Sequence, residues 1–292
     1  MISVELILLA LSPIFLALIA WEWWRYRQVK PAIYRWQDSL ANAILALMYQ
    51  GGEFIAVIVL MPVFIVIYQW RLFEIEINVS TLFLAFLLQD FLYYWFHRAS
   101  HQVRWLWASH IAHHSSRLMN FSTAFRQSLT YPISGMWLFW TPMMLIGFSP
   151  KIVLAVVALN LAFQFFVHTQ SVKKLGVLEY IFNTPSHHRV HHACNPCYID
   201  KNFAGVLIIW DHIFGTFIAE SESEPCRYGI TDNFESDNPL LITFYEWQKM
   251  WQDLLVANNV GEKWLSLFGP PRPKVNIDTT DKSLTISNEK ID

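Results

Sequence analysis

The sequence has little charge. Lysine, arginine, aspartate and glutamate make up only 15% of its 292 residues, whereas about a quarter is usual in soluble globular proteins. The net charge is −2, so the chain lacks the basic excess that attracts nucleic acids, and we expect no nucleic-acid partner. Hydrophobic residues reach 54%. This composition is typical of an integral membrane protein if the apolar residues fall in long runs.

Cysteine is also scarce. The three cysteines are too few for a disulfide framework. Cys194 and Cys197 have the spacing of a zinc knuckle, but no second C-x-x-C pair exists, so we interpret them as part of a loop. The sequence also lacks the H-E-x-x-H helix of zinc proteases, a Gly-rich dinucleotide-binding turn and the C-x-x-C-H haem motif. Electrons for any redox reaction would therefore come from a separate donor.

Long apolar runs are present. The first run is followed by no small-residue cleavage site, which favours a retained membrane helix over a signal peptide. We interpret 39–50 as an interfacial stretch that Gly51 and Gly52 separate from the second run. The runs approach the 17–25 residues that cross hydrocarbon, and they lie at 4–24, 53–70, 79–96, 131–148 and 151–168.

The predicted fold is all-α: an integral membrane bundle of about four or five transmembrane helices, with a cytosolic helical cap that holds a histidine-rich dimetal site. Basic clusters follow the first, third and fifth runs, which places those ends on the cytosolic side of a bacterial inner membrane or of the endoplasmic reticulum. The expected parts are N-terminal membrane helices (1–78), a catalytic region (79–220), a C-terminal cytosolic helical segment (221–269) and a disordered tail (270–292).

The histidines are unevenly distributed. None of the eleven lies in the first 96 residues or in the last 80. Several recur at spacings of three and four, which places imidazoles on one face of a helix. The chain returns to the same side of the membrane after the 131–168 hairpin, so distant groups can converge. The candidate metal ligands are His97, His101, His110, His113, His114, His168, His187, His188, His191 and His192.

Ten histidines exceed the needs of one metal ion and suit two. Imidazole binds iron, zinc, copper and nickel, so spacing alone leaves the metal open, and a structural or transport zinc site remains an alternative. His187 would point about 100° away from His188 on a regular helix. His212 is interpreted as an ordinary polar residue.

Four stretches resemble the fatty acid hydroxylase superfamily, also called the sterol desaturase family: DFLYYWFHRASH, WASHIAHHSS, NTPSHHRVHH and LIIWDHIFGTF. Together they span about residues 80–220. Within the family, residues 113–128 and 183–205 are most similar to the branch of alkylglycerol monooxygenases. That branch hydroxylates the carbon next to the ether oxygen of glyceryl ethers, with tetrahydrobiopterin as reductant. The chain departs from it by ending soon after residue 270.

The resemblance implies a membrane-bound di-iron oxygenase that hydroxylates a lipid C–H bond with O2. It implies two iron ions, which zinc can replace in preparations, and an external reductant, for which tetrahydrobiopterin is a candidate. Asp90 and Asp211, and Asn160 as a further candidate, would support the ligands from the second shell. A sterol or fatty-acyl desaturase is the alternative within the family, and a zinc-binding membrane transporter or sensor is the alternative outside it.

Overall fold

The computed structural model describes residues 4–232 and 234–271, and every regular element in those ranges is a helix, which confirms the predicted fold class. Of the tail expected at 270–292, residues 272–292 lie outside the described residues. The α-helices are α1 (Val4–Tyr26), α2 (Trp36–Gln69), α3 (Val79–Gln102), α4 (Arg104–His114), α5 (Thr141–Ile146), α6 (Pro150–Phe165), α7 (Pro185–His191), α8 (Ile209–Ile213), α9 (Pro239–Val256) and α10 (Val260–Phe268). Short 3-10 helices lie at Pro31–Ile33, Phe121–Phe125, Pro132–Ser134, Met136–Trp140 and Gly176–Tyr180.

Helix α2 is longer than the sequence suggested. It continues for 34 residues, so the expected separation of 39–50 from 53–70 at Gly51 and Gly52 is wrong. Gly52 lies inside the helix, where it allows close packing of another segment and forms no turn. A Cβ atom at this position would lie 3.1 Å from the carbonyl oxygen of Leu129. The missing side chain therefore lets the segment before the 131–148 region approach the helix backbone.

Substitution of Gly52 by alanine is expected to lower the free energy of unfolding by about 1 kcal/mol, because the added methyl group overfills this contact. Gly51 provides a matched control, since nothing lies within 4 Å of a Cβ atom there. Alanine at that open helical position is expected to stabilise by about 0.5–1 kcal/mol. Thermal unfolding in detergent should therefore move the two midpoints in opposite directions. Equal shifts would contradict the close contact at Gly52.

The expected membrane run 131–148 does not form one helix. Its backbone turns at Gly135, whose φ of 85° lies in the left-handed region, and α5 begins again with Pro142 in its first turn. The predicted turn between this region and the next helix is confirmed at Gly147, where φ is 139°. A Cβ atom there would lie 2.3 Å from the carbonyl oxygen of Phe73. Glycine is thus required both by the backbone angle and by the packing.

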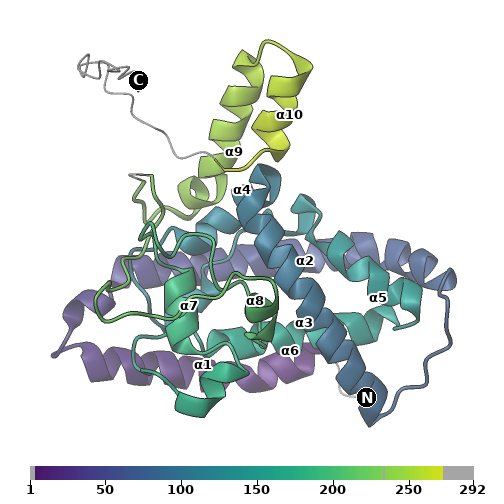
Figure 1. Ribbon diagram of the computed structural model, residues 1–292, viewed down its shortest axis with the longest axis horizontal. Coiled ribbons are helices and arrows are strands. Elements are labelled where there is room, and N and C mark those ends of the chain that lie inside the picture. Colours follow the sequence, from purple (N-terminus) through teal and green to yellow (C-terminus); the bar gives the residue numbers. More distant parts are fainter. Residues whose placement is uncertain (1–3, 233, 272–292) are drawn as a thin grey trace, which may run out of the picture.

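The helices around the histidines are joined by a few extensive contacts. Helix α3 packs against α4 and α6, α9 packs against α4, and α2 packs against the 3-10 helix Phe121–Phe125. In Figure 1, the α9–α10 pair extends away from the rest of the molecule beside α4. The histidine-bearing end of α3 and all of α4 are therefore held between the long apolar helices and the C-terminal pair.

A buried ion pair fixes α2 against the end of α4. Arg126 is 1% exposed, and its Nη1 lies 3.1 Å from Oδ1 of Asp38 and 2.8 Å from Oδ1 of Asn42. Its Nε donates to the carbonyl oxygen of Ala112 at 3.1 Å. Arg126 therefore joins α2 to the end of α4.

Two described helices, α2 and α3, are long and apolar enough to cross a membrane. The C-terminal half of α2 exposes a row of large apolar side chains that no element among the described residues covers. A row of this size on a protein surface is typical of a lipid or protein contact. We therefore describe the chain as a membrane protein, and the number of spans stays a prediction. The exposed residues include Phe54, Ile58, Val59, Val63 and Val66.

Candidate metal centre

Nine of the ten predicted ligands gather into two groups. One ring nitrogen of each histidine lies within 4.8 Å of the corresponding nitrogen of every other member of its group. The groups touch where the rings of His114 and His192 stack, with centroids 4.4 Å apart. The first group is His97, His101, His110, His114 and His191, and the second is His113, His168, His188 and His192.

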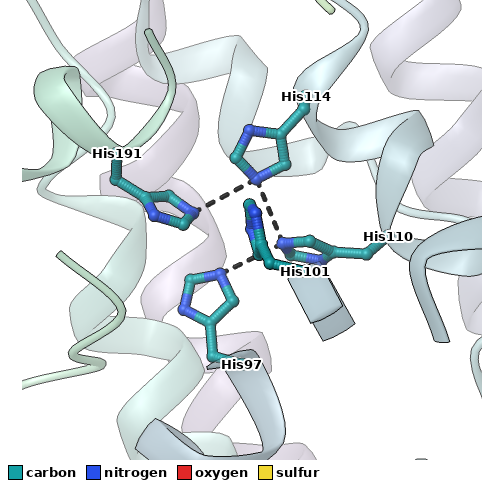
Figure 2. A group of neighbouring side chains, drawn as sticks. All are labelled: His97, His101, His110, His114 and His191. Atoms are coloured by element: carbon teal, nitrogen blue, oxygen red, sulfur yellow. Dashed lines mark hydrogen bonds between the residues drawn. The ribbon is translucent and has the colours of Figure 1, made fainter. Parts of the chain in front are cut away.

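The first group combines three elements that are distant in the sequence. Helix α3 supplies His97 and His101, α4 supplies His110 and His114, and α7 supplies His191. Figure 2 shows the five imidazoles directed toward a common centre, with the Nε2 atoms of His114 and His191 3.1 Å apart. Residues four apart on α3 and on α4 thus present paired rings, as the sequence predicted.

The second group lies beside the first. His113 comes from α4, His168 follows the end of α6, and His188 and His192 come from α7 and the residue after it. The Nε2 atoms of His168 and His188 are 2.9 Å apart, and those of His188 and His192 are 3.1 Å apart. Helices α4 and α7 therefore contribute to both groups, which makes the two groups a single unit.

The tautomers of several rings are fixed by backbone carbonyl groups. A carbonyl oxygen only accepts, so the facing Nδ1 must carry the hydrogen and Nε2 presents a lone pair. Nδ1 of His168 lies 2.6 Å from the Gln164 oxygen, and Nδ1 of His113 lies 3.2 Å from the Arg126 oxygen. Yet their Nε2 atoms are 3.1 Å apart. Two neutral rings of this tautomer would direct their Nε2 lone pairs at each other. These lone pairs repel each other unless a cation lies between them and binds both nitrogen atoms.

Burial keeps these rings in the form that binds metals. It lowers the pKa of His188, His191 and His192 well below the usual value, and the neighbouring imidazoles lower the pKa further. The same two causes lower the pKa of His110 and His114 in α4. A metal binds the neutral imidazole. At neutral pH these side chains therefore offer lone pairs without first losing a proton, and the residues present fit divalent metal ions.

One loop orients three ligands of the first group. In residues 199–207, hereafter the 199–207 loop, the carbonyl oxygen of Lys201 faces Nδ1 of His191 at 3.0 Å. The carbonyl oxygen of Phe203 faces Nδ1 of His97 at 2.8 Å. The carboxylate of Asp200 lies 3.5 Å from Nδ1 of His101. These contacts fix ring orientation, which is how groups around a metal centre tune its ligands.

The backbone of the 199–207 loop explains why three successive contacts reach the same site. Asp200 and Asn202 have φ values of 58° and 55°, a left-handed conformation that Asp and Asn tolerate better than most residues. The Asn202 side chain donates to the carbonyl oxygen of Ile218 at 2.8 Å and accepts from the Ile218 amide at 2.9 Å. These two hydrogen bonds to Ile218 hold the strained turn in place.

The two predicted second-shell carboxylates hold this loop and do not contact the ligand rings. Asp211 accepts from the amides of Phe203 and Ala204 at 2.8 Å each. Asp90 accepts from the amides of Val206 and Leu207 at 2.8 and 3.0 Å. It also accepts from Trp210 Nε1 at 2.9 Å and Asn160 Nδ2 at 2.8 Å. Their support of the ligands therefore runs through the backbone of the loop.

Substitution of Asn202 by alanine is expected to weaken metal binding in the first group by about 10- to 100-fold, the usual effect of losing a group that orients ligands. The cause is the loss of the Ile218 hydrogen bonds together with a left-handed backbone that alanine resists. Substitution by glycine should recover part of the loss, because glycine accepts this backbone without cost. Competition with a fluorescent chelator measures the affinity. Equal losses in both variants would contradict the role assigned to the backbone conformation.

The remaining predicted residues lie outside the two groups. Nε2 of His187 lies 3.9 Å from Oε2 of Glu179, and its ring packs on Phe217. His212 is exposed and stacks on the same phenylalanine. Cys194 and Cys197 belong to neither metal-binding group. His187 precedes His191 by four residues, a spacing that also occurs between members of the two groups. Its side chain points toward Glu179 and Phe217 instead of into either group.

Sequence reasoning missed Tyr131, Asp200 and Asn202. The hydroxyl of Tyr131 makes a short contact with Nδ1 of His110, and nothing in the sequence around it indicates this. Asp200 and Asn202 flank a lysine in a polar turn, which is a signal for left-handed backbone. That signal could have located the turn, although it could not have placed carbonyl groups against histidines.

The fold and the site together define a helical membrane protein with two buried, all-histidine groups that could each hold a metal ion. The fatty acid hydroxylase family model matches residues 82–216, a range that contains all nine grouped histidines and both carboxylates. This region of the chain is therefore similar to the fatty acid hydroxylase family. No solved structure matches the chain.

Curated relatives agree with this assignment. Alkylglycerol monooxygenase of Danio rerio is 45% identical over 215 residues, which cover 72% of this chain and 47% of the relative. The human alkylglycerol monooxygenase is 44% identical over 221 residues, covering 72% and 48%. Ornithine lipid hydroxylase OlsE of Rhizobium tropici is 30% identical over 149 residues, covering 51% and 45%. The chain thus spans about half the length of the curated relatives it matches.

Proposed function

We propose that the protein is a membrane-bound di-iron oxygenase that hydroxylates a C–H bond of a lipid with O2. The observation that carries the proposal is the pair of buried histidine groups at the end of a membrane-length helix. Breaking an unactivated C–H bond is beyond the acid–base chemistry of side chains and needs a metal. The family match and the names of the relatives support a lipid as the substrate class.

Each iron ion would be held by one of the two histidine groups, and together they would supply the activation of dioxygen. The chain's own residues hold the ligands in place. The 199–207 loop orients three rings, and Asp90 and Asp211 fix that loop. The groups are buried, which excludes bulk water from the reacting centre. α2 and α3 carry exposed apolar side chains, and a lipid substrate would reach the protein from the bilayer that these side chains would contact. We place the metal site on the cytosolic side of a bacterial inner membrane or of the endoplasmic reticulum.

A glyceryl ether lipid is the first candidate substrate. The relatives from Danio rerio and human carry the name alkylglycerol monooxygenase, and they share 45% and 44% identity with the chain. Hydroxylation next to an ether oxygen yields a hemiacetal, which separates into an alcohol and a fatty aldehyde. A separate reductant must supply two electrons for each turnover, and tetrahydrobiopterin is our candidate.

Two other functions compete with this proposal. A sterol or fatty-acyl desaturase would use the same metal ligands and would release an alkene. A zinc transporter or sensor would place ionisable residues near the middle of the bilayer. The grouped histidines instead meet at helix ends, where α3, α4 and α7 come together. This arrangement favours a fixed catalytic centre over a transport path.

The test uses the iron-loaded protein in detergent, an alkylglycerol, tetrahydrobiopterin and isotopically labelled O2. We expect near two irons per chain and labelled fatty aldehyde. The monoacylglycerol of equal chain length is the matched control, because its ester carbonyl replaces the C–H bonds beside the ether oxygen. An alkene product without label would support the desaturase. At most one metal ion, always zinc, with no oxygen-dependent product would overturn the oxygenase.

A further inference from the structure

Helices α9 and α10 lie outside the part of the chain that matches the family model, and both expose apolar side chains. In α10, Val260 and Trp264 are four residues apart, and they are 83% and 63% exposed. In α9, Phe244, Trp251 and Leu255 are seven and four residues apart, and all three are exposed. Residues at these spacings share one side of a helix. Each helix of the pair therefore presents an apolar stripe to its surroundings.

The side of the pair opposite these stripes is charged. Asp253 in α9 and Glu262 in α10 each lie two residues from stripe residues, which is about 200° around a helix. Both carboxylates line a groove between the two helices. Arg104 of α4 lines the same groove, and its Nη1 lies 2.6 Å from Oδ2 of Asp253. The pair is thus amphipathic as a unit, with charged groups on one side and apolar side chains on the other.

A row of aromatic rings joins the apolar side of the pair to the rest of the molecule. The ring centroid of Trp105 in α4 lies 4.9 Å from that of Trp247 in α9 and 6.2 Å from that of Phe268, which continues the α10 stripe by one turn. Nε1 of Trp105 donates to the carbonyl oxygen of Ser134 at 3.1 Å. Ile133, the preceding residue, is exposed. The apolar side of the pair therefore continues into the apolar segment that the sequence predicted for the membrane.

The direction of the pair suits a membrane surface. In Figure 1, α9 and α10 run crosswise to α2, which is long and apolar enough to cross a bilayer. Helices crosswise to a spanning helix lie along the plane of the membrane. Tryptophan is enriched at this level of a bilayer, because its ring is apolar and its N–H is polar.

We propose that the α9–α10 pair lies along the surface of the bilayer that α2 crosses, with its apolar stripes among the lipid headgroups and its charged groove toward water. Helices of this interfacial kind contact lipid without spanning it. A second copy of the chain is the competing occupant of the stripes. Continuity with the membrane segment at Ser134 favours lipid, because a protein partner would have to displace lipid from that segment as well. The inference does not depend on the chemistry of the histidine groups.

The test measures the depth of nitroxide labels in the full-length protein, reconstituted in phosphatidylcholine vesicles. Serine first replaces the three native cysteines, Cys194, Cys197 and Cys226. Single labels are then attached through Val260→Cys on the α10 stripe and Trp251→Cys on the α9 stripe. Glu262→Cys on the charged side of α10 is the matched control. Collisions with O2, which concentrates among acyl chains, and with a water-soluble nickel chelate present on both sides of the vesicles give the depth of each label.

We expect the labels at Val260 and Trp251 to lie about 5–10 Å into the boundary between headgroups and acyl chains, and the label at Glu262 to collide mainly with the nickel chelate. Thermal unfolding identifies any variant that does not fold, and the stripe label that remains then decides. Stripe labels that the nickel chelate reaches as readily as the label at Glu262 would overturn the proposal. Stripe labels shielded from both reagents, with magnetic coupling between labels of two chains, would overturn it in favour of a second copy.

Discussion

Replacement of His191 by alanine is expected to lower the metal content from two ions per chain to one. His191 is one of five imidazoles in the first group, and its Nε2 lies 3.1 Å from that of His114. Replacement of His188 should remove the other ion, because His188 belongs to the second group and lies 2.9 Å from His168. Each variant should lose more than about 100-fold in activity, since even groups behind the ligands commonly account for 10- to 100-fold.

Elemental analysis after dialysis against a weak chelator gives the metal content, and aldehyde release from an alkylglycerol gives the activity. His212→Ala is the control, because His212 is exposed and belongs to neither group. His187→Ala tests the boundary of the site. If it lost a metal ion as His191→Ala does, the ligand set drawn from the geometry would be incomplete. If His191→Ala and His188→Ala both kept two ions, the assignment of two groups would be wrong.

Replacement of Asp90 by alanine is expected to destabilise the protein by about 3–5 kcal/mol, the range for breaking a buried charged network. Asp90 is fully buried and accepts four hydrogen bonds, two of them from backbone amides of the 199–207 loop. Alanine would leave those donors unpaired beside an apolar helix. The loop would then lose its anchor, so the first group should release its metal ion at a lower chelator concentration than the second.

Thermal unfolding in detergent and stepwise chelation measure the two effects separately. Glu74→Ala is the control, because this carboxylate is 81% exposed and pairs with Arg71 at the surface. Such exposed pairs contribute about 0–1 kcal/mol. Equal destabilisation by both variants would contradict the anchoring role. Loss of both metal ions at the same chelator concentration would contradict the link between Asp90 and the first group.

The parts of the site that follow helical periodicity could be predicted from the sequence. His97 and His101, and His110 and His114, lie one turn apart, and one turn is a local property that tertiary contacts rarely change. The all-α fold followed from long apolar runs in the same way. His187 shows the limit. Its neighbour His188 turns into the second group while His187 faces Glu179, and that choice depends on how α7 sits against other elements.

The sequence-based predictions failed at positions where the packing of the backbone determines the structure. Gly51 and Gly52 resemble a turn, yet Gly52 is a contact point inside α2 because Leu129 approaches it closely. The carbonyl oxygens of Lys201 and Phe203 orient two ligand rings, and every residue has a carbonyl oxygen. Such partners have no residue-type signature. Asp90 and Asp211 were predicted as carboxylates that support the metal ligands, but their hydrogen-bond partners in the 199–207 loop could not be predicted from the sequence.

The distribution of each histidine group over distant segments sets the order in which the protein can mature. The first group lacks His191 until α7 has been made, and His168, His188 and His192 of the second group also come late in the chain. A nascent chain that has emerged only as far as α6 therefore exposes part of each group without being able to complete either. Closing the long loop from α3 to α7 costs entropy that metal binding can offset only once both ends are present. If each group holds a metal ion, we expect both sites to be completed late, after the helices that precede α7 have been synthesised.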